Sequence, residues 1–233
     1  MTSKAILLVA AMAAALVLAA GVALAVTEID CSADSPCLGT KGEDNIKGTE
    51  NPETIKALAK DDVVYGNEGN DTIYGDTGDD GVYGDGGNDT IYGDAGEDWI
   101  DGYSGNDTIY GGVGNDIKLQ GSEDSDTVYG GAGNDSINAA DFDDPWESSA
   151  DPVDYSYGQS GNDTIYADDG NEDIVDCGEE TRNRRDKDTV FYDVGLDTIE
   201  NCEVENPPTT TSASSAASTE EEGTMRRSTE QRR

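Results

Sequence analysis

The sequence predicts an all-β fold, a β-solenoid whose short strands stack on one another, and three observations predict it. Nonapeptides of the pattern G-x-x-G-x-D-x-U-x, where U is aliphatic, follow one another at a fixed spacing from Gly66 onward. Each unit offers one aliphatic residue, which can form a thin column of stacked side chains but not a globular core. The units are rich in glycine, and the 233-residue chain has 29 Gly but only 2 Phe.

The register of the repeat is perfect over five units, which read GNEGNDTIY, GDTGDDGVY, GDGGNDTIY, GDAGEDWID and GYSGNDTIY. Weaker units extend the array upstream to Gly39 and downstream to Gly130, and after residues 139–157 two more begin at Gly158 and Ala167. A dozen motifs at one spacing are not a chance pattern. Internal repeats of this length are typical of solenoids.

Each position of the unit has a physical role. Glycines at positions 1 and 4 permit positive φ angles and a close approach of backbones. Because side chains alternate along a strand, positions 7 and 9 point outward when position 8 points inward. The inward residues expected from this rule are Ile46, Ile55, Val64, Ile73, Val82, Ile91, Ile100, Ile109, Val128, Ile137, Ile165 and Ile174. The unit from Gly111 has a tenth residue and Lys118 at the aliphatic position, so a local bulge is expected to turn Leu119 inward and Lys118 outward.

The charge of the chain poses a problem for stacking. Asp and Glu number 51 against 14 Lys and Arg, the formal net charge is -37, and residues 61–176 hold 31 acids and one lysine. Two carboxylates about 4 Å apart repel by about 1 kcal/mol in water, and a dozen such contacts would approach or exceed the usual stability margin of about 5–15 kcal/mol. A divalent cation between the turns converts this repulsion into a net attraction. Oxygen ligands without any histidine favour calcium as that cation. Such an acidic surface also argues against nucleic acid as a partner.

The units GGAGND and GGVGND resemble the repeats-in-toxin (RTX), or haemolysin-type, calcium-binding nonapeptide. The resemblance implies a parallel β-roll built from nonapeptide repeats, with multiple calcium ions as cofactors. It also implies that turns at positions 1–6 bind these ions through Asp carboxylates and backbone carbonyls, and that two units complete one rung. The metal ligands it implies are Asp44, Asp62, Asp71, Asp80, Asp89, Asp98, Asp107, Asp116, Asp126, Asp135 and Asp163, with Glu53 and Glu172 at the same position in weaker units.

The segments on either side of the repeat array predict export of the protein and caps at both ends of the roll. Lys4, the apolar stretch 5–20 and the triplet 23–25 (ALA) are typical of a signal peptide over residues 1–25, so we expect a secreted, extracellular protein with no membrane insertion after signal removal. An oxidising compartment favours disulfides. Of three possible connectivities, local pairing is the simplest, which makes the ends of the roll disulfide-stapled: Cys31 with Cys37 and Cys177 with Cys202.

The expected organisation is therefore a signal peptide (1–25), an N-terminal disulfide cap (26–38), the calcium-binding roll (39–176), a C-terminal disulfide cap (177–205) and a disordered Ser/Thr-rich tail (206–233). Residues 139–157 are either a loop or two degenerate units, with Asp144 and Asp154 in position-6 register.

The leading functional interpretation is a non-catalytic protein that folds on binding several calcium ions between stacked turns. No unit combines Arg or Lys with Asp as carboxylate-based catalysis on polysaccharide would require. The alternative is a calcium-dependent adhesive or glycan-binding module, whose partner is a cell-surface glycan or another β-roll. Its face would be an outward Thr/Tyr ladder on alternate units, at 72–74, 90–92, 108–110, 127–129 and 164–166. Thr and Tyr also simply suit strands.

Overall fold

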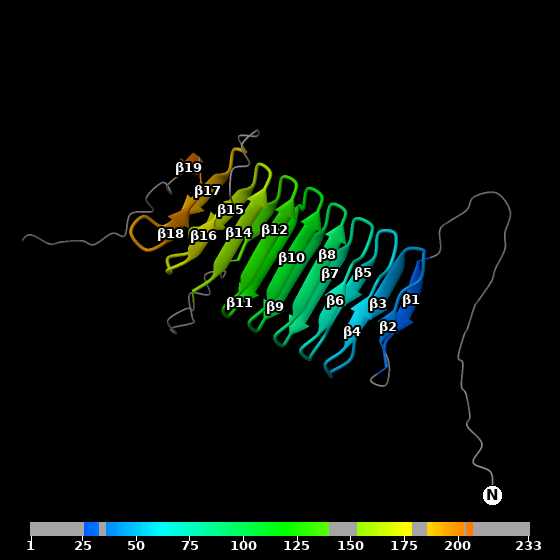
Figure 1. Cartoon of the computed structure of the whole chain (residues 1–233). Coiled ribbons are helices and arrows are strands. Elements are labelled where there is room, and N and C mark those ends of the chain that lie inside the picture. The colour runs from blue at the N-terminus through cyan, green and yellow to red at the C-terminus, as the bar shows by residue number, and fades with distance from the viewer. Residues whose placement is uncertain (1–25, 33–35, 140–152, 179–185, 203, 207–233) are drawn as a thin grey trace, which may run out of the picture.

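The computed structural model describes residues 26–32, 36–139, 153–178, 186–202 and 204–206, and these residues form strands and turns without any helix. The strands are wound into a parallel β-roll in which successive strands alternate between two sheets. Figure 1 shows the rungs stacked in chain order, from β1 and β2 at the blue end to β17–β19 at the orange end. The predicted fold class is confirmed.

All neighbouring strands in both sheets run parallel, and units two apart in the sequence pair with each other. The odd sheet consists of β1 (Thr27–Asp30), β3 (Asp44–Lys47), β5 (Val63–Tyr65), β7 (Gly81–Gly86), β9 (Trp99–Ser104), β11 (Lys118–Glu123), β13 (Ser136–Asn138), β15 (Thr164–Ala167), β17 (Thr189–Tyr192) and β19 (Val204–Asn206). The even sheet consists of β2 (Cys37–Leu38), β4 (Thr54–Lys56), β6 (Thr72–Tyr74), β8 (Thr90–Ala95), β10 (Thr108–Val113), β12 (Thr127–Ala132), β14 (Tyr155–Ser160), β16 (Ile174–Asp176) and β18 (Thr198–Glu200).

The core lies between the sheets and is filled by the position-8 column. Eleven of the twelve predicted inward residues have no exposed surface, and within a sheet they stack directly, as Ile73, Ile91 and Ile109 do. The twelfth prediction is wrong, because Val175 occupies the core while Ile174 faces outward. The last unit has one extra residue in its turn, which shifts the inward position by one.

The unit that contains Lys118 absorbs its tenth residue as predicted. Lys118 pairs with Trp99 at an outward position, and Leu119 pairs with Ile100 and is fully buried. The extra residue, Ile117, is exposed before the strand begins.

Part of the ambiguous segment 139–157 belongs to the roll. Strand β14 (Tyr155–Ser160) lies between β12 and β16, Asp154 is buried, and Ser156 takes the core position. This is a degenerate unit in the sense predicted for Asp154, whereas Asp144 lies outside the described residues. Because β14 adds a strand to the even sheet, residues 164–166 fall on the odd sheet, and their predicted place in the even ladder is wrong.

The glycines at positions 1 and 4 of the turn have different roles, whereas the sequence predicted the same two roles for both. Position-4 glycines have positive φ, for example 123° at Gly87, but the second positive φ falls on position 2, as at Asp85 (69°) and Asp94 (70°), and not on position 1. The position-1 glycines are needed for close approach instead. A Cβ on Gly84 would lie 2.7 Å from the carbonyl oxygen of Gly102 in the next rung, so no side chain fits there.

Both predicted disulfides are present, Cys31–Cys37 and Cys177–Cys202. The strands beside them continue both sheets: β1 pairs with β3 and β17 with β15 in the odd sheet, and β2 pairs with β4 and β18 with β16 in the even sheet. The predicted signal peptide and residues 207–233 of the predicted tail lie outside the described residues. The described part of the chain offers no helix long and apolar enough to cross a membrane.

Candidate metal sites

The predicted metal ligands lie in two rows, one for each sheet. Each of these aspartates lies at the end of a turn, either at the first residue of a strand or one or two residues before it. Because the strands are in register, equivalent carboxylates stack from one rung to the next. The odd row contains Asp44, Asp62, Asp80, Asp98, Asp116, Asp135 and Asp163, and the even row contains Asp71, Asp89, Asp107 and Asp126. All eleven are at most 3% exposed.

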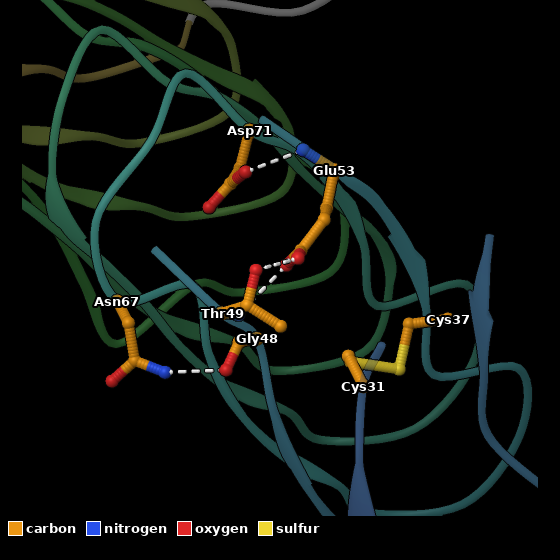
Figure 2. The surroundings of a disulfide bond; sticks show 7 residues. All are labelled: Cys31, Cys37, Gly48, Thr49, Glu53, Asn67 and Asp71. Atoms are coloured by element: carbon orange, nitrogen blue, oxygen red, sulfur yellow. Dashed lines mark hydrogen bonds between the residues drawn. A yellow bond between two sulfur atoms is a disulfide. The ribbon is translucent and has the colours of Figure 1, made fainter. Parts of the chain in front are cut away.

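In ten of the eleven carboxylates, all except that of Asp44, one oxygen accepts a hydrogen bond from the backbone of the neighbouring rung. The backbone N–H of Asp71 donates to Oδ1 of Asp89 at 2.7 Å, and the N–H of Asp89 donates to Oδ1 of Asp107 at 2.8 Å. Figure 2 shows the same contact one rung earlier, where the N–H of Glu53 donates to the Asp71 carboxylate at 2.7 Å. The partners are 18 residues apart, so two nonapeptides complete one rung.

The other carboxylate oxygen is buried and lacks a hydrogen-bond partner at nine of these positions: Asp62, Asp71, Asp80, Asp89, Asp98, Asp107, Asp116, Asp135 and Asp163. In eight of the nine, this oxygen faces the first glycine of its own unit; the exception is Asp62, whose unit begins with Ala57. The point where a Cβ of Gly84 would lie is 2.5 Å from Oδ2 of Asp89 and 2.7 Å from the carbonyl oxygen of Gly102. A carboxylate oxygen and a carbonyl oxygen thus approach the same place, and neither can donate a proton to the other.

Burial makes these carboxyl groups hard to ionise without a cation. Desolvation, reinforced by neighbouring carboxylates and opposed by the backbone hydrogen bond, raises the pKa of Asp80 and Asp107 to about 8 and that of Asp89 to about 7. A hard cation that accepts carboxylate and carbonyl oxygens offsets this penalty, and calcium tolerates irregular ligand geometry of that kind. The residues present therefore fit calcium.

The ligands available are carboxylates spaced along a row together with turn carbonyls. No three acidic or cysteine side chains of the described residues converge into a compact cluster. In the described part of the chain, the carboxylates are therefore arranged along stacked turns and not around a single convergent pocket.

The N-terminal end of each row differs from its interior. The backbone N–H and the hydroxyl of Thr40 donate to the Asp44 carboxylate, and those of Thr49 donate to the Glu53 carboxylate (Figure 2). These two carboxylates are thus satisfied by their own turns. Asp44 therefore needs a cation less than the nine predicted ligands whose second oxygen has no donor.

Sequence reasoning missed the C-terminal continuation of both rows. The N–H of Asp163 donates to Oδ1 of Asp188 at 2.9 Å, and the N–H of Asp173 donates to Oδ1 of Asp197 at 3.1 Å. The signal was present, since both Asp188 and Asp197 begin a D-T-aliphatic triplet like those of the repeats. The prediction for Glu172 is wrong: it is exposed, and the extra turn residue gives its position to Asp173.

Stacked turns lined by buried carboxylates define a repeat protein of the calcium-binding β-roll class. The RTX calcium-binding nonapeptide repeat matches this chain in four copies, over residues 47–82, 83–117, 118–144 and 153–175, which together make up just over half of its length. The chain belongs to this family. A search of curated proteins finds no significant match.

Proposed function

We propose that this protein is a secreted, non-catalytic calcium-binding β-roll that folds as calcium ions bind between its stacked turns. The observation that carries the proposal is the pair of rows of buried carboxylates, nine of which have a second oxygen without a hydrogen-bond donor. An isolated buried charge is strongly unfavourable, and so many in one small domain require compensation. The eleven predicted aspartates are the proposed ligands, together with the turn carbonyls.

The residues of the roll prepare the sites in three ways. Backbone N–H groups fix Oδ1 of every proposed ligand except Asp44 and so orient Oδ2. Position-1 glycines leave room for the oxygens to converge, and the aliphatic column holds the rungs in register. A bound calcium ion would supply the positive charge that these oxygens lack. The predicted signal peptide and the two disulfides support export to an oxidising compartment.

A calcium titration of the purified protein tests this function. Circular dichroism and hydrodynamic radius should show an expanded chain with little β structure in chelator and a compact β protein in millimolar calcium, because binding to the folded state alone drives folding. Magnesium at the same concentration should be much less effective, since it demands a stricter octahedral geometry. Unchanged β signal and radius on calcium addition would refute the proposal.

The packing of the tyrosine rings bears on the alternative function, in which the Thr/Tyr ladder is an adhesive or glycan-binding face. Successive rings on the even sheet lie 4.7–4.9 Å apart with planes within 11° of parallel, along the column Tyr74, Tyr92, Tyr110, Tyr129 and Tyr157. The Lys56 ammonium lies 4.1 Å from the Tyr74 ring centroid and covers the end of the column. Each interior ring therefore has both faces covered, and the ladder presents edges and hydroxyls outward. Stacking favours a stabilising role, with recognition of a glycan or of another roll as the second candidate.

A triple substitution distinguishes these roles. Replacing Thr90, Thr108 and Tyr110 by lysine should raise the calcium concentration needed for folding if the ladder stabilises the roll. If instead the ladder is a recognition face, folding should change little while binding to cell-surface glycan is lost.

A further inference from the structure

A pocket of about 510 Å³ interrupts the outward face of the odd sheet, away from the carboxylate rows. Its lining includes Glu68, Asp85, Asp101, Tyr103, Gln120 and Glu123. It arises because the outward column that begins with the stacked rings of Tyr65 and Tyr83 continues, in register, with Asp101 and Gln120. Its volume lies within the range of pockets for small organic ligands, about 300–1,000 Å³.

The lining contains a buried polar group with no partner. Gln120 is 1% exposed, and its side-chain carbonyl oxygen accepts no hydrogen bond. Its neighbour Asp101 is satisfied, because Lys118 donates to one oxygen at 3.0 Å and Ser122 donates to the other at 2.9 Å. Lys118 and Asp101 come from neighbouring rungs, and the repeat pattern of a single unit does not predict their contact. The Gln120 oxygen is left as an acceptor for a ligand.

The charge of the pocket is negative. Lys118–Asp101 is the one ion pair found among the described residues, so Glu68, Asp85 and Glu123 keep their charges uncompensated by a cation within ion-pair distance. Such a lining attracts a positively charged hydrogen-bond donor. The hydroxyl groups of Ser104 and Ser122 already donate to the Asp85 carbonyl oxygen and to Asp101. The Lys118 ammonium donates one proton to Asp101, which leaves two further protons that a ligand with hydroxyl oxygens can accept and a purely cationic ligand cannot.

An exposed aromatic ring completes the lining. Tyr103 is 45% exposed, and its ring is tilted by 48° to that of Tyr83 with centroids 6.3 Å apart. Unlike the stacked rings of the even sheet, it leaves apolar surface uncovered. An aromatic surface beside hydrogen-bonding groups accommodates a ligand with one apolar face and a hydroxylated rim.

We propose that this pocket binds a protonated amino sugar, free or as a unit of a polysaccharide. The ammonium group is held between the carboxylates of Glu68 and Asp85, which lie on adjacent rungs, and Glu123 adds negative charge farther along the pocket. Gln120 accepts a hydrogen bond from a ligand hydroxyl or amine. The sugar ring lies against Tyr103, and Lys118 donates to ligand hydroxyl oxygens. The inference needs a folded roll but does not depend on which residues bind calcium.

Isothermal titration calorimetry in saturating calcium and about 0.15 M salt tests the ligand class. A glucosamine tetrasaccharide should bind. Its N-acetylated counterpart should bind with an affinity lower by about tenfold or more, because a charged hydrogen bond is lost. Glucosamine monomer distinguishes a free ligand from a polysaccharide unit by its affinity relative to the tetramer. Absence of binding, equal binding of the neutral sugar, or spermidine binding as tightly as the amino sugar would overturn the proposal.

Matched variants test the residues. Asp85→Asn should weaken sugar binding about tenfold, whereas Asp94→Asn, at the same repeat position on the even sheet and with the same positive φ, should not change it. Gln120→Leu should abolish detectable binding while the calcium midpoint for folding stays the same or falls. Equal effects from Asp85→Asn and Asp94→Asn would overturn the assignment, as would normal binding by Gln120→Leu. If Gln120→Leu does not fold, the asparagine pair still decides.

Discussion

Replacing Asp89 by asparagine is expected to change stability in opposite directions with and without calcium. Asp89 lies in the interior of the even row, where Oδ1 accepts the Asp71 N–H and buried Oδ2 has no partner. Asparagine keeps the Oδ1 acceptor. Its amide nitrogen replaces Oδ2 and can donate to the carbonyl of Gly102, which approaches the same point beside Gly84. The substitution thus removes an uncompensated charge from the metal-free fold and a ligand from the calcium-bound fold.

The size of each stability change follows from the surroundings of Asp89 Oδ2, which has no partner in the metal-free fold and binds calcium in the calcium-bound fold. A buried polar group without a partner costs about 1–3 kcal/mol, so the metal-free roll should gain about that much. With calcium bound, the loss of one charge-assisted contact should reduce the free energy of unfolding by about 1.5–3 kcal/mol. The calcium midpoint should rise accordingly.

In saturating calcium, urea denaturation followed by far-ultraviolet circular dichroism measures the loss of stability. In chelator at pH 8, where the chain is expected to be largely unfolded, the concentration of trimethylamine N-oxide needed to recover the β signal measures the stability of the metal-free roll. Asp168→Asn is the control, because Asp168 is exposed, carries the same charge and lies outside both rows. The reasoning is refuted if Asp89→Asn shifts stability in the same direction under both conditions. It is equally refuted if the control has effects of the same size.

Three other outcomes are expected. Without calcium, the fold should be most stable near pH 4 and lose stability as pH rises toward 8, because the pKa of Asp80 and Asp107 is about 8 in the roll against 3.8 for an unperturbed aspartate. Calcium affinity should rise over the same range, and a metal-free β signal that grows with pH would contradict this reasoning. Tyr110→Ala should destabilise the calcium-bound roll by about 1–3 kcal/mol in urea melts, because it removes two stacked contacts worth about 0.5–1.5 kcal/mol each. If Tyr110→Ala destabilises the roll less than Tyr103→Ala does, the ladder does not stabilise it. Replacing Cys177 and Cys202 by alanine should lower the free energy of unfolding by about 3 kcal/mol, given a separation of 25 residues, and an unchanged urea midpoint would show that this end does not limit stability.

Much of the fold could be predicted from the sequence because the repeat is strictly local. One aliphatic residue per nine determined the inward column, and the alternation of a strand then determined which side chains face outward. The residue types also determined the row of carboxylates, since position 6 precedes every strand. Even the bulge at Lys118 followed from counting residues, because a tenth residue has to leave the ladder while Leu119 keeps the core position.

Only the tertiary structure decided how units far apart in the sequence meet. Whether β14 belongs to the roll could not be read from Ser156, a polar residue in the core column, and that strand moved residues 164–166 to the other sheet. The contact of Lys118 with Asp101 and the unpartnered oxygen of Gln120 depend on side chains from neighbouring rungs that are 17 or more residues apart. A repeat pattern specifies what each rung contributes to the core and turns, whereas an outward pocket exists only where departures from the pattern in successive rungs come to lie side by side.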